Sequence, residues 1–234
     1  MEDKLKREIQ KFLGLTVDGQ IGPISIKAIS SKLSCGNDIK SIQKAVGVIA
    51  DGELGPVSYQ AIVTKLGIKI DVSNTTTDTN WPKQDYNSMV KFYGNVGENQ
   101  TTLILPYEMY LAWEPETKVH KISCHKKIHD SLERIFEKTL NHYGIDKIKE
   151  LRLDSFGGCL NVRKMRGGSS WSIHSWGAAI DLDPDRNQLK WGKDKAVFAK
   201  PEYTEFWKIV EGEGATSLGR SRNMDWMHLQ FADL

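Results

Sequence analysis

Apolar residues in the first part of the chain recur at the spacing of helical turns. One apolar stripe consists of Leu5, Ile9, Phe12 and Leu13. The segment DGQIGP, residues 18–23, predicts a turn, and Pro23 is placed to open a second helix. The buried side of that second helix is formed by Ile24, Ala28 and Leu33. The pattern therefore predicts a helix–turn–helix unit.

This unit occurs twice. Residues 9–33 align with residues 42–66 without a gap, at an offset of 33. The shared positions include Ile9/Ile42, Gln10/Gln43, Gly14/Gly47, Asp18/Asp51, Gly22/Gly55, Pro23/Pro56 and Ala28/Ala61. Neither unit is large enough to bury its apolar face alone, so we expect the two to pack together. The sequence thus predicts a small all-α domain over residues 1–68.

The polar stretch DVSNTTTDTN predicts a linker over residues 69–80, and Trp81-Pro82 begins a second domain, 81–234. Loops and a short helix are expected before residue 101. Residues 102–107 and 118–123 have the composition of strands. Helices are predicted over 125–141, ended by Gly144, and over 201–210, opened by Pro201. Between them, Gly157-Gly158 predicts a tight turn. The second domain is therefore expected to be α+β.

Two segments alternate between apolar and polar residues, as strands do. In AAIDLD, residues 178–183, the side chains of Asp181 and Asp183 would share one face, with Ile180 and Leu182 on the other. In WMHLQF, residues 226–231, one face carries Trp226, His228 and Gln230. If these strands are neighbours in a central antiparallel sheet, His228 lies beside Asp181.

Composition argues against nucleic-acid binding, a membrane span and secretion. The chain has 234 residues and a formal net charge of +2, and it contains no block of Lys and Arg typical of nucleic-acid binding. It has no apolar run long enough to span a membrane, and MEDKLKREIQ lacks the apolar core of a signal peptide, so we expect a cytoplasmic monomer. Cys35, Cys124 and Cys159 are widely spaced and are expected to be reduced thiols.

The candidate chemistry lies in the two alternating segments. His174 stands seven positions before Asp181, and a bend at residues 175–177 would turn it back over that carboxylate. Asp225 stands three positions before His228, an odd spacing that would place the two side chains on opposite faces of one strand. We therefore expect Asp225 in the turn that precedes this strand. Two imidazoles and one carboxylate are a common ligand set for catalytic zinc, and a further carboxylate can serve as general base.

Each of these residues also has an ordinary structural explanation. A single histidine beside a strand is usually packed or exposed, the two aspartates can form a solvated strand face, and Asp225 can cap a turn. A second histidine pair, His125 and His129, has the spacing of an H-E-x-x-H zinc motif, but Lys126 stands where that motif needs glutamate. With Lys127 beside it, this pair favours a solvated helix face over a metal site, even though Cys124 is adjacent.

The joint pattern S-x-H-x-x-G-x-A-x-D-x-D, followed by D-x-x-H, resembles the zinc peptidases of bacterial cell walls. These are the D-alanyl-D-alanine carboxypeptidases and the phage L-alanyl-D-glutamate endopeptidases. The matching residues are Ser172, His174, Gly177, Ala179, Asp181, Asp183, Asp225 and His228. The resemblance covers about the last 130 residues. It implies that His174, Asp181 and His228 bind Zn²⁺ and that Asp225 is the catalytic carboxylate, a position held by Glu in some members and Asp in others.

The resemblance also implies an arginine that holds a substrate carboxylate or steadies the oxyanion. Arg163, eleven residues before His174, is the first candidate and Arg166 the second, although either can be a plain surface residue. Ser172 is expected to bind substrate or to brace the loop. The Trp-Gly-Gly segment that these peptidases often have after the helix at 201–210 is replaced by EGEGATSLGRSRN, which leaves the substrate preference open.

In the first domain, Q-K-x-x-G followed by D-G-x-x-G-P resembles the peptidoglycan-binding repeat of wall hydrolases, with a plain helical spacer as the alternative. Together the two resemblances imply a phage-type endolysin. It would stay in the host cytoplasm until release to the wall and then cut the stem peptide, with the L-Ala–D-Glu bond favoured. The alternatives are a D-alanyl-D-alanine carboxypeptidase and a catalytically inert wall-binding protein.

Overall fold

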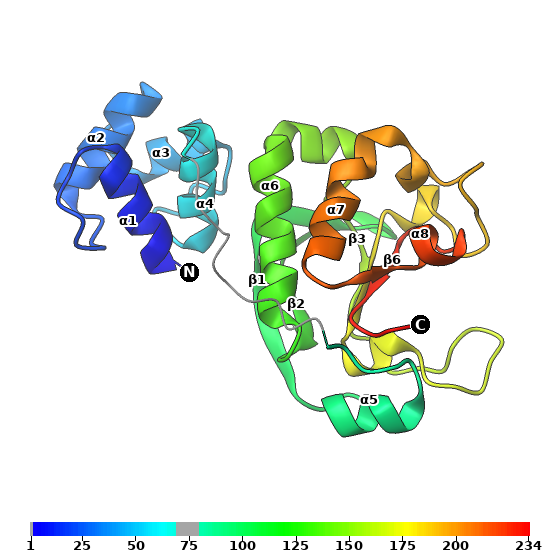
Figure 1. Cartoon of the computed structure of the whole chain (residues 1–234). Helices are drawn as coiled ribbons and strands as arrows, with labels where there is room; N and C mark the ends of the chain where they lie inside the picture. The colour runs from blue at the N-terminus through cyan, green and yellow to red at the C-terminus, as the bar shows by residue number, and fades with distance from the viewer. Residues whose placement is uncertain (1, 69–79) are drawn as a thin grey trace. The chain divides into compact units, whose positions relative to one another are not determined.

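The computed structural model describes residues 2–68 and 80–234 of a chain that divides into two compact units, 1–74 and 75–234 (Figure 1). Each unit has its own cluster of buried apolar side chains. The predicted linker, residues 69–80, lies outside the described residues except for Asn80. None of the described helices is long and apolar enough to cross a membrane.

The first unit consists of α1 (Glu2–Phe12), α2 (Pro23–Leu33), α3 (Ile39–Val46) and α4 (Pro56–Lys65). The predicted helix–turn–helix pattern is present in both repeats, and Pro23 and Pro56 each occupy the first turn of the second helix. Ile9 and Ile42, which hold the same position in the two repeats, are both fully buried in the shared core. The two repeats therefore complete one hydrophobic core, as the pattern predicted.

Identical hydrogen bonds hold the turn of each repeat. Gln10 Nε2 donates to Asp18 Oδ1 over 2.6 Å, and Gln10 Oε1 accepts from the Gly19 N–H over 2.8 Å. Gln43, Asp51 and Gly52 repeat both bonds, at 2.7 and 2.9 Å. The recurring Gln and Asp of the sequence repeat thus satisfy buried polar groups of the turn.

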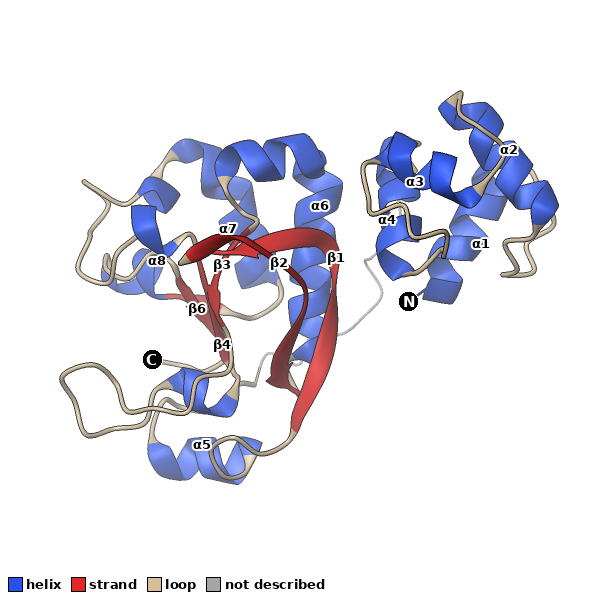
Figure 2. Cartoon of the chain, turned by 180° about the vertical axis from the view of Figure 1, so that it is seen from behind, coloured by secondary structure: helices blue, strands red, loops and turns tan. Residues whose placement is uncertain are grey.

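The second unit is built around a six-stranded sheet with the order β2-β1-β3-β4-β6-β5 (Figure 2). The strands are β1 (Gln100–Leu111), β2 (Glu114–His125), β3 (Ser155–Gly158), β4 (Ala179–Leu182), β5 (Thr216–Ser217) and β6 (His228–Gln230). The helices are α5 (Tyr86–Tyr93), α6 (His129–Leu151), α7 (Thr204–Gly212) and α8 (Leu218–Arg222). Single 3₁₀ turns span Ile173–Trp176, Pro184–Arg186, Val197–Ala199 and Pro201–Tyr203. The predicted α+β class is confirmed.

The sheet is mixed rather than purely antiparallel, which corrects the prediction. β1 and β3 pair in parallel, whereas the other neighbouring strands are antiparallel. The connection from β1 to β3 runs through β2 and α6, and α6 packs against β1 on one face of the sheet (Figures 1 and 2). Such a long crossover is what a parallel pair of strands requires.

Three predicted element boundaries are wrong. The helix predicted over 125–141 begins at His129 and continues past a kink at Gly144 to Leu151, while His125 ends β2. Gly157 and Gly158, predicted as a tight turn, lie in β3. Pro201 opens a 3₁₀ turn, and α7 begins only at Thr204. In the first two cases strand pairing across the sheet decides the local conformation, because β2 pairs with β1 and β3 with β4.

Candidate metal centre

β4 and β6 are antiparallel neighbours, and Asp181 stands directly opposite His228 in their register. The expectation that these two strands pair is therefore confirmed. His174 lies in the 3₁₀ turn Ile173–Trp176, which ends at Gly177 with a φ of 63°, a left-handed conformation that glycine adopts without strain. This turn brings His174 back over β4, as the sequence predicted, so that its Nε2 lies 3.2 Å from Asp181 Oδ1.

The three candidate ligand atoms form a nearly equilateral triangle. His174 Nε2 lies 3.1 Å from His228 Nδ1, and His228 Nδ1 lies 2.9 Å from Asp181 Oδ1. Ligands bound tetrahedrally at 2.0–2.1 Å from zinc are separated by about 3.3 Å. The edges of the triangle, 2.9 to 3.2 Å, are close to that separation. The group therefore has the dimensions of three corners of a zinc tetrahedron.

The hydrogen bonds of His174 determine which ring nitrogen faces the triangle with a lone pair. Its Nδ1 lies 2.7 Å from the carbonyl oxygen of Cys159, an atom that only accepts, so Nδ1 carries the proton of the neutral ring. Nε2 is then an unprotonated nitrogen aimed at Asp181. Holding the second nitrogen of a metal-binding histidine in this way is the usual role of a carbonyl oxygen next to a metal site.

A glutamine fixes His228 in the corresponding way. Gln230 Nε2 donates to Gln84 Oε1 over 3.0 Å and to the Ala232 carbonyl over 2.9 Å. Gln230 Oε1 is thereby left to face His228 Nε2 at 3.1 Å, so Nε2 is the protonated nitrogen and Nδ1 bears the lone pair. A cation bound by this group would take the lone pairs of His174 Nε2, His228 Nδ1 and Asp181 Oδ1, in place of a proton shared with the ionised carboxylate.

The charges of the group stabilise one another: burial opposes a charged His228, but the hydrogen bond to Asp181 raises the pKa of its ring. Burial opposes ionisation of Asp181, but the neighbouring His174 and His228 hold the pKa of its carboxyl well below the usual range. Gly157 of β3 lets Asp181 pack closely against the backbone of β3. A side-chain carbon at this glycine would lie only 3.0 Å from the Cβ of Asp181. Asp181 therefore stays ionised and tightly held.

Asp225 occupies the turn before β6, as expected from its parity. Its backbone accepts from the His228 N–H over 3.0 Å, and its N–H donates to the Leu189 carbonyl over 3.0 Å. The residue is 7% exposed, and its Oδ1 has no hydrogen-bond partner among the described residues. Burial raises the pKa of the Asp225 carboxyl to about 6, against the opposing influence of His228. A buried carboxylate without a partner is costly to keep and is typical of a functional position.

Asp183 does not share the face of Asp181, contrary to the alternation. β4 ends at Leu182, and Asp183 takes a left-handed conformation with a φ of 44°. Its carboxylate is fully buried and accepts from Arg186 Nε over 2.6 Å, with Arg152 Nε 3.4 Å away. Asp183 is therefore neutralised by structural ion pairs and is no substitute base for Asp225.

The candidate arginines lie on a hairpin that covers residues 161–172. The Arg163 carbonyl accepts from the Ser172 N–H over 3.1 Å, and Lys164 pairs with Trp171. The Arg163 guanidinium donates to the neighbouring Lys164 carbonyl over 3.1 Å. Arg166 is exposed, and its positive charge acts to lower the pKa of Asp225. Of the two arginines, Arg166 is therefore the one whose charge reaches the candidate base, whereas the backbone of Ser172 closes the hairpin.

The second histidine pair does not converge. His125 is buried rather than solvated, with Nε2 2.8 Å from the Tyr93 carbonyl and Nδ1 accepting from the Lys127 N–H over 3.1 Å. His129 lies on α6 and faces Asp130 at 2.8 Å. Both ring nitrogens of His125 are thus occupied by the backbone. The expectation of a solvated face is wrong for this residue, because it ends β2, which pairs with β1 at the edge of the sheet, instead of opening a helix.

The three cysteines are free thiols. Burial raises the pKa of Cys124 to about 12, and it raises the pKa of Cys159 as well. Neither thiol is therefore a ready source of thiolate for a metal.

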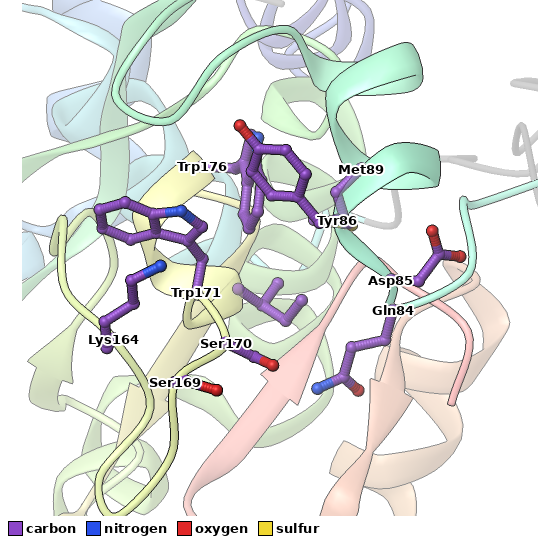
Figure 3. A pocket seen from close by; sticks show the side chains of 10 residues that line it. Gln84, Asp85, Tyr86, Met89, Lys164, Ser169, Ser170, Trp171 and Trp176 are labelled. Atoms are coloured by element: carbon purple, nitrogen blue, oxygen red, sulfur yellow. The ribbon is translucent and has the colours of Figure 1, made fainter.

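A pocket of about 540 Å³ is lined in part by the 3₁₀ turn that carries His174 (Figure 3). Its walls come from the start of α5, from the hairpin and from the 3₁₀ turn that carries His174. Gln230 shares the strand face of His228 in the sequence pattern, whereas no pattern in the sequence marks Gln84, Tyr86 or Trp171. Only the parity of Gln230 with His228 was a usable indication.

Comparison with known proteins adds no relative. No protein-family model matches the sequence, and neither the curated proteins nor the solved structures contain a significant match.

Proposed function

We propose that the second unit is a zinc-dependent peptidase that hydrolyses the stem peptide of bacterial peptidoglycan. The observation that carries this proposal is the convergence of lone pairs from His174, Asp181 and His228 beside the buried, unpaired carboxylate of Asp225. When bound by these three ligands, zinc supplies a Lewis acid that polarises a peptide carbonyl and acidifies water.

Asp225 is the proposed general base. The turn before β6 holds its backbone at both the N–H and the carbonyl, and its Oδ1 is left without a protein partner. A carboxylate held in this way accepts a proton from the attacking water and later delivers it to the leaving amine. Asp183 is excluded from the role because Arg186 and Arg152 pair with its carboxylate.

The hairpin supplies positive charge for the substrate. Arg166 is the arginine whose charge acts on Asp225, and Arg163 and Lys164 lie in the same segment. A guanidinium binds a carboxylate through two parallel hydrogen bonds, so these residues suit an anionic stem peptide. We assign substrate binding first to Arg166 and then to Arg163, the reverse of the order that sequence spacing favoured. Ser172 is retained as the residue that braces the hairpin.

The substrate class comes from the two sequence motifs and from the repeat unit. Binding of the first unit to the wall raises the local concentration of the second unit at its polymer. A lytic enzyme gains most from cutting near the glycan, since one cut there detaches the whole cross-linked stem. We therefore favour the L-Ala–D-Glu bond. The alternative is release of terminal D-Ala, because the same arginines suit a terminal carboxylate.

Metal analysis tests the centre. The unaltered protein is expected to bind one zinc per chain, and His174→Ala, Asp181→Ala and His228→Ala should each lower the zinc content and abolish hydrolysis. His120→Ala is the matched control, because His120 is an exposed histidine of β2 that belongs to neither group of candidate metal ligands among the described residues. Full zinc occupancy in the His174→Ala protein would refute the assignment.

Wall digestion tests the reaction. Purified peptidoglycan is incubated with the zinc-loaded protein, and the new amino termini are labelled and identified by mass spectrometry. New amine on Glu supports the proposed bond, whereas free D-Ala without a new Glu terminus identifies the carboxypeptidase. An intact wall with every stem uncut would show that the second unit is an inert scaffold.

A further inference from the structure

The pocket lined in part by the 3₁₀ turn that carries His174 has aromatic walls. Tyr86 and Trp176 face each other with ring centroids 6.3 Å apart, and Trp171 lies next to them (Figure 3). Trp176 is buried, and its indole N–H donates to the Gly94 carbonyl over 2.9 Å, so this ring is a rigid floor. Tyr86 is 55% exposed and stands at the mouth. We call this site, defined by Tyr86, Trp171 and Trp176, the aromatic pocket.

The rim of the aromatic pocket is polar. Gln84, Ser169 and Ser170 line it, and Lys164 Nζ lies 3.7 Å from the ring centroid of Trp171 (Figure 3). Lys164 covers one face of that ring, in a cation–π contact, and the Trp171 side chain lines the pocket. The volume of about 540 Å³ lies within the usual range of about 300–1,000 Å³ for small-molecule sites.

The aromatic pocket is joined to the candidate metal ligands by two short links. Gln84 accepts from Gln230, and Gln230 in turn accepts from the Nε2–H of His228. On the other side, Ile173 lines the pocket and is followed directly by His174. The pocket is therefore linked to both candidate histidine ligands, through the chain to His174 and through hydrogen bonds to His228.

The aromatic rings and the polar rim of the aromatic pocket together favour a sugar over a purely apolar ligand. A purely apolar side chain would leave the amide of Gln84 and the two serine hydroxyls unused. A pyranose ring uses both features, because its C–H face stacks on an aromatic ring while its hydroxyl and acetamido groups form hydrogen bonds at the edges. In peptidoglycan the sugar that carries the stem peptide is an N-acetylated amino sugar of this kind.

We propose that the aromatic pocket binds the N-acetylmuramoyl ring of the glycan strand and so positions the first peptide bonds of the stem at the metal centre. This inference rests on the proposed function and specifies its substrate. The L-Ala–D-Glu bond is one residue away from that sugar, whereas the terminal D-Ala is several residues away. A sugar bound in the aromatic pocket would therefore favour cleavage near the glycan.

Two soluble substrates test the inference with the full-length zinc protein. One is an N-acetylmuramoyl stem peptide, and the other is the same peptide with an acetyl group in place of the sugar. The muramoyl peptide is expected to show a kcat/KM that is about 3- to 10-fold higher, mainly through a lower KM, which is the scale of aromatic stacking. Tyr86→Ala and Trp171→Ala should each remove this preference, and Tyr86→Ala should leave the rate on the acetyl peptide unchanged.

A control variant and two contrary outcomes separate failure of the sugar site from failure of the proposed peptidase activity. Trp113→Ala removes a tryptophan that is 66% exposed at the turn between β1 and β2, and it should keep the preference. Equal rates on the two peptides in the unaltered protein, or a preference that survives in Tyr86→Ala, would overturn the sugar site but leave the peptidase intact. Hydrolysis of neither peptide would instead overturn the proposed function and this inference with it. Because Tyr86 is exposed, its variant tests the site even if Trp171→Ala fails to fold.

Discussion

Replacing Gln230 by leucine tests how the protein prepares His228 for a metal. Gln230 is fully buried, and its Oε1 accepts from His228 Nε2 over 3.1 Å. In the zinc-bound protein the ring of His228 is fixed by the metal, so removing the acceptor leaves a buried N–H unpaired. In the metal-free protein the ring is free to turn toward another partner. The substitution is therefore expected to destabilise the zinc-bound state more than the metal-free state.

The expected loss of zinc affinity follows from this difference between the zinc-bound and metal-free states. An unpaired buried donor costs about 1–3 kcal/mol, which corresponds to a zinc Kd raised about 5- to 150-fold. Loss of an outer hydrogen bond to a metal-bound histidine usually costs about 10- to 100-fold in affinity, which falls in the same range. Gln84→Ala removes one of the two bonds that orient the Gln230 amide, so its effect should be in the same direction and smaller.

The assay is a competition titration of the full-length protein against a chromogenic zinc chelator. Gln43→Leu is the matched control, because Gln43 is an equally buried glutamine in the first unit and should leave the zinc Kd unchanged. Circular dichroism confirms that each variant is folded. A folded Gln230→Leu protein with the zinc Kd of the unaltered chain would falsify the proposed role of the glutamine.

Three further predictions concern the base, the first unit and a buried ion pair. Asp225→Asn should retain zinc but lose roughly 10²–10⁴-fold in kcat, and near-normal turnover would place the base elsewhere. Because burial raises the pKa of Asp225 from 3.8 to about 6, the folded metal-free protein binds this proton more tightly than the unfolded chain does. Its free energy of unfolding should therefore fall by up to about 3 kcal/mol between about pH 4 and about pH 6, and denaturant titrations of Asp225→Asn should show a smaller fall. A fragment of residues 1–68 should sediment with purified peptidoglycan, and a fragment that stays in the supernatant would favour the spacer alternative. Glu213 is fully buried between Arg134 Nε at 2.8 Å and Lys138 Nζ at 2.5 Å, so Glu213→Ala should destabilise the protein by about 3–5 kcal/mol in denaturant titrations; a loss below about 1 kcal/mol would show the pair to be dispensable.

Local periodicity in the sequence was enough to predict the repeat unit and the core of the candidate site. Ile9 and Ile42 recur at the same repeat position, and both are buried, because helical spacing alone places them on the inner face. The alternation around Asp181 and His228 predicted that each would project from a strand toward the same side. Side-chain direction within one helix or strand is a property of neighbouring residues, so it can be read along the chain.

Other features depend on segments that are distant in sequence. Asp183 follows the alternation but leaves the strand, since its carboxylate is taken up by Arg152 and Arg186. His125 is buried because β2 pairs with β1, and the parallel pairing of β1 with β3 needs the crossover through α6. No spacing within either strand specifies these contacts, because each is decided by which surfaces the chain buries together.

The surroundings of the candidate metal-binding group show most clearly which features the sequence determines and which depend on tertiary structure. The sequence by itself determined that two histidines and two aspartates lie in two short segments that favour strands, since parity and turn residues are local. Only the tertiary structure decided the rest. It brought Gln84 to Gln230 across 146 positions, oriented His228 through that bond, and placed Tyr86 beside Trp176 to form the aromatic pocket. The physical reason is that hydrogen bonds and ring contacts of this kind form between packed surfaces, and packing is settled by the burial of the whole core rather than by any one segment.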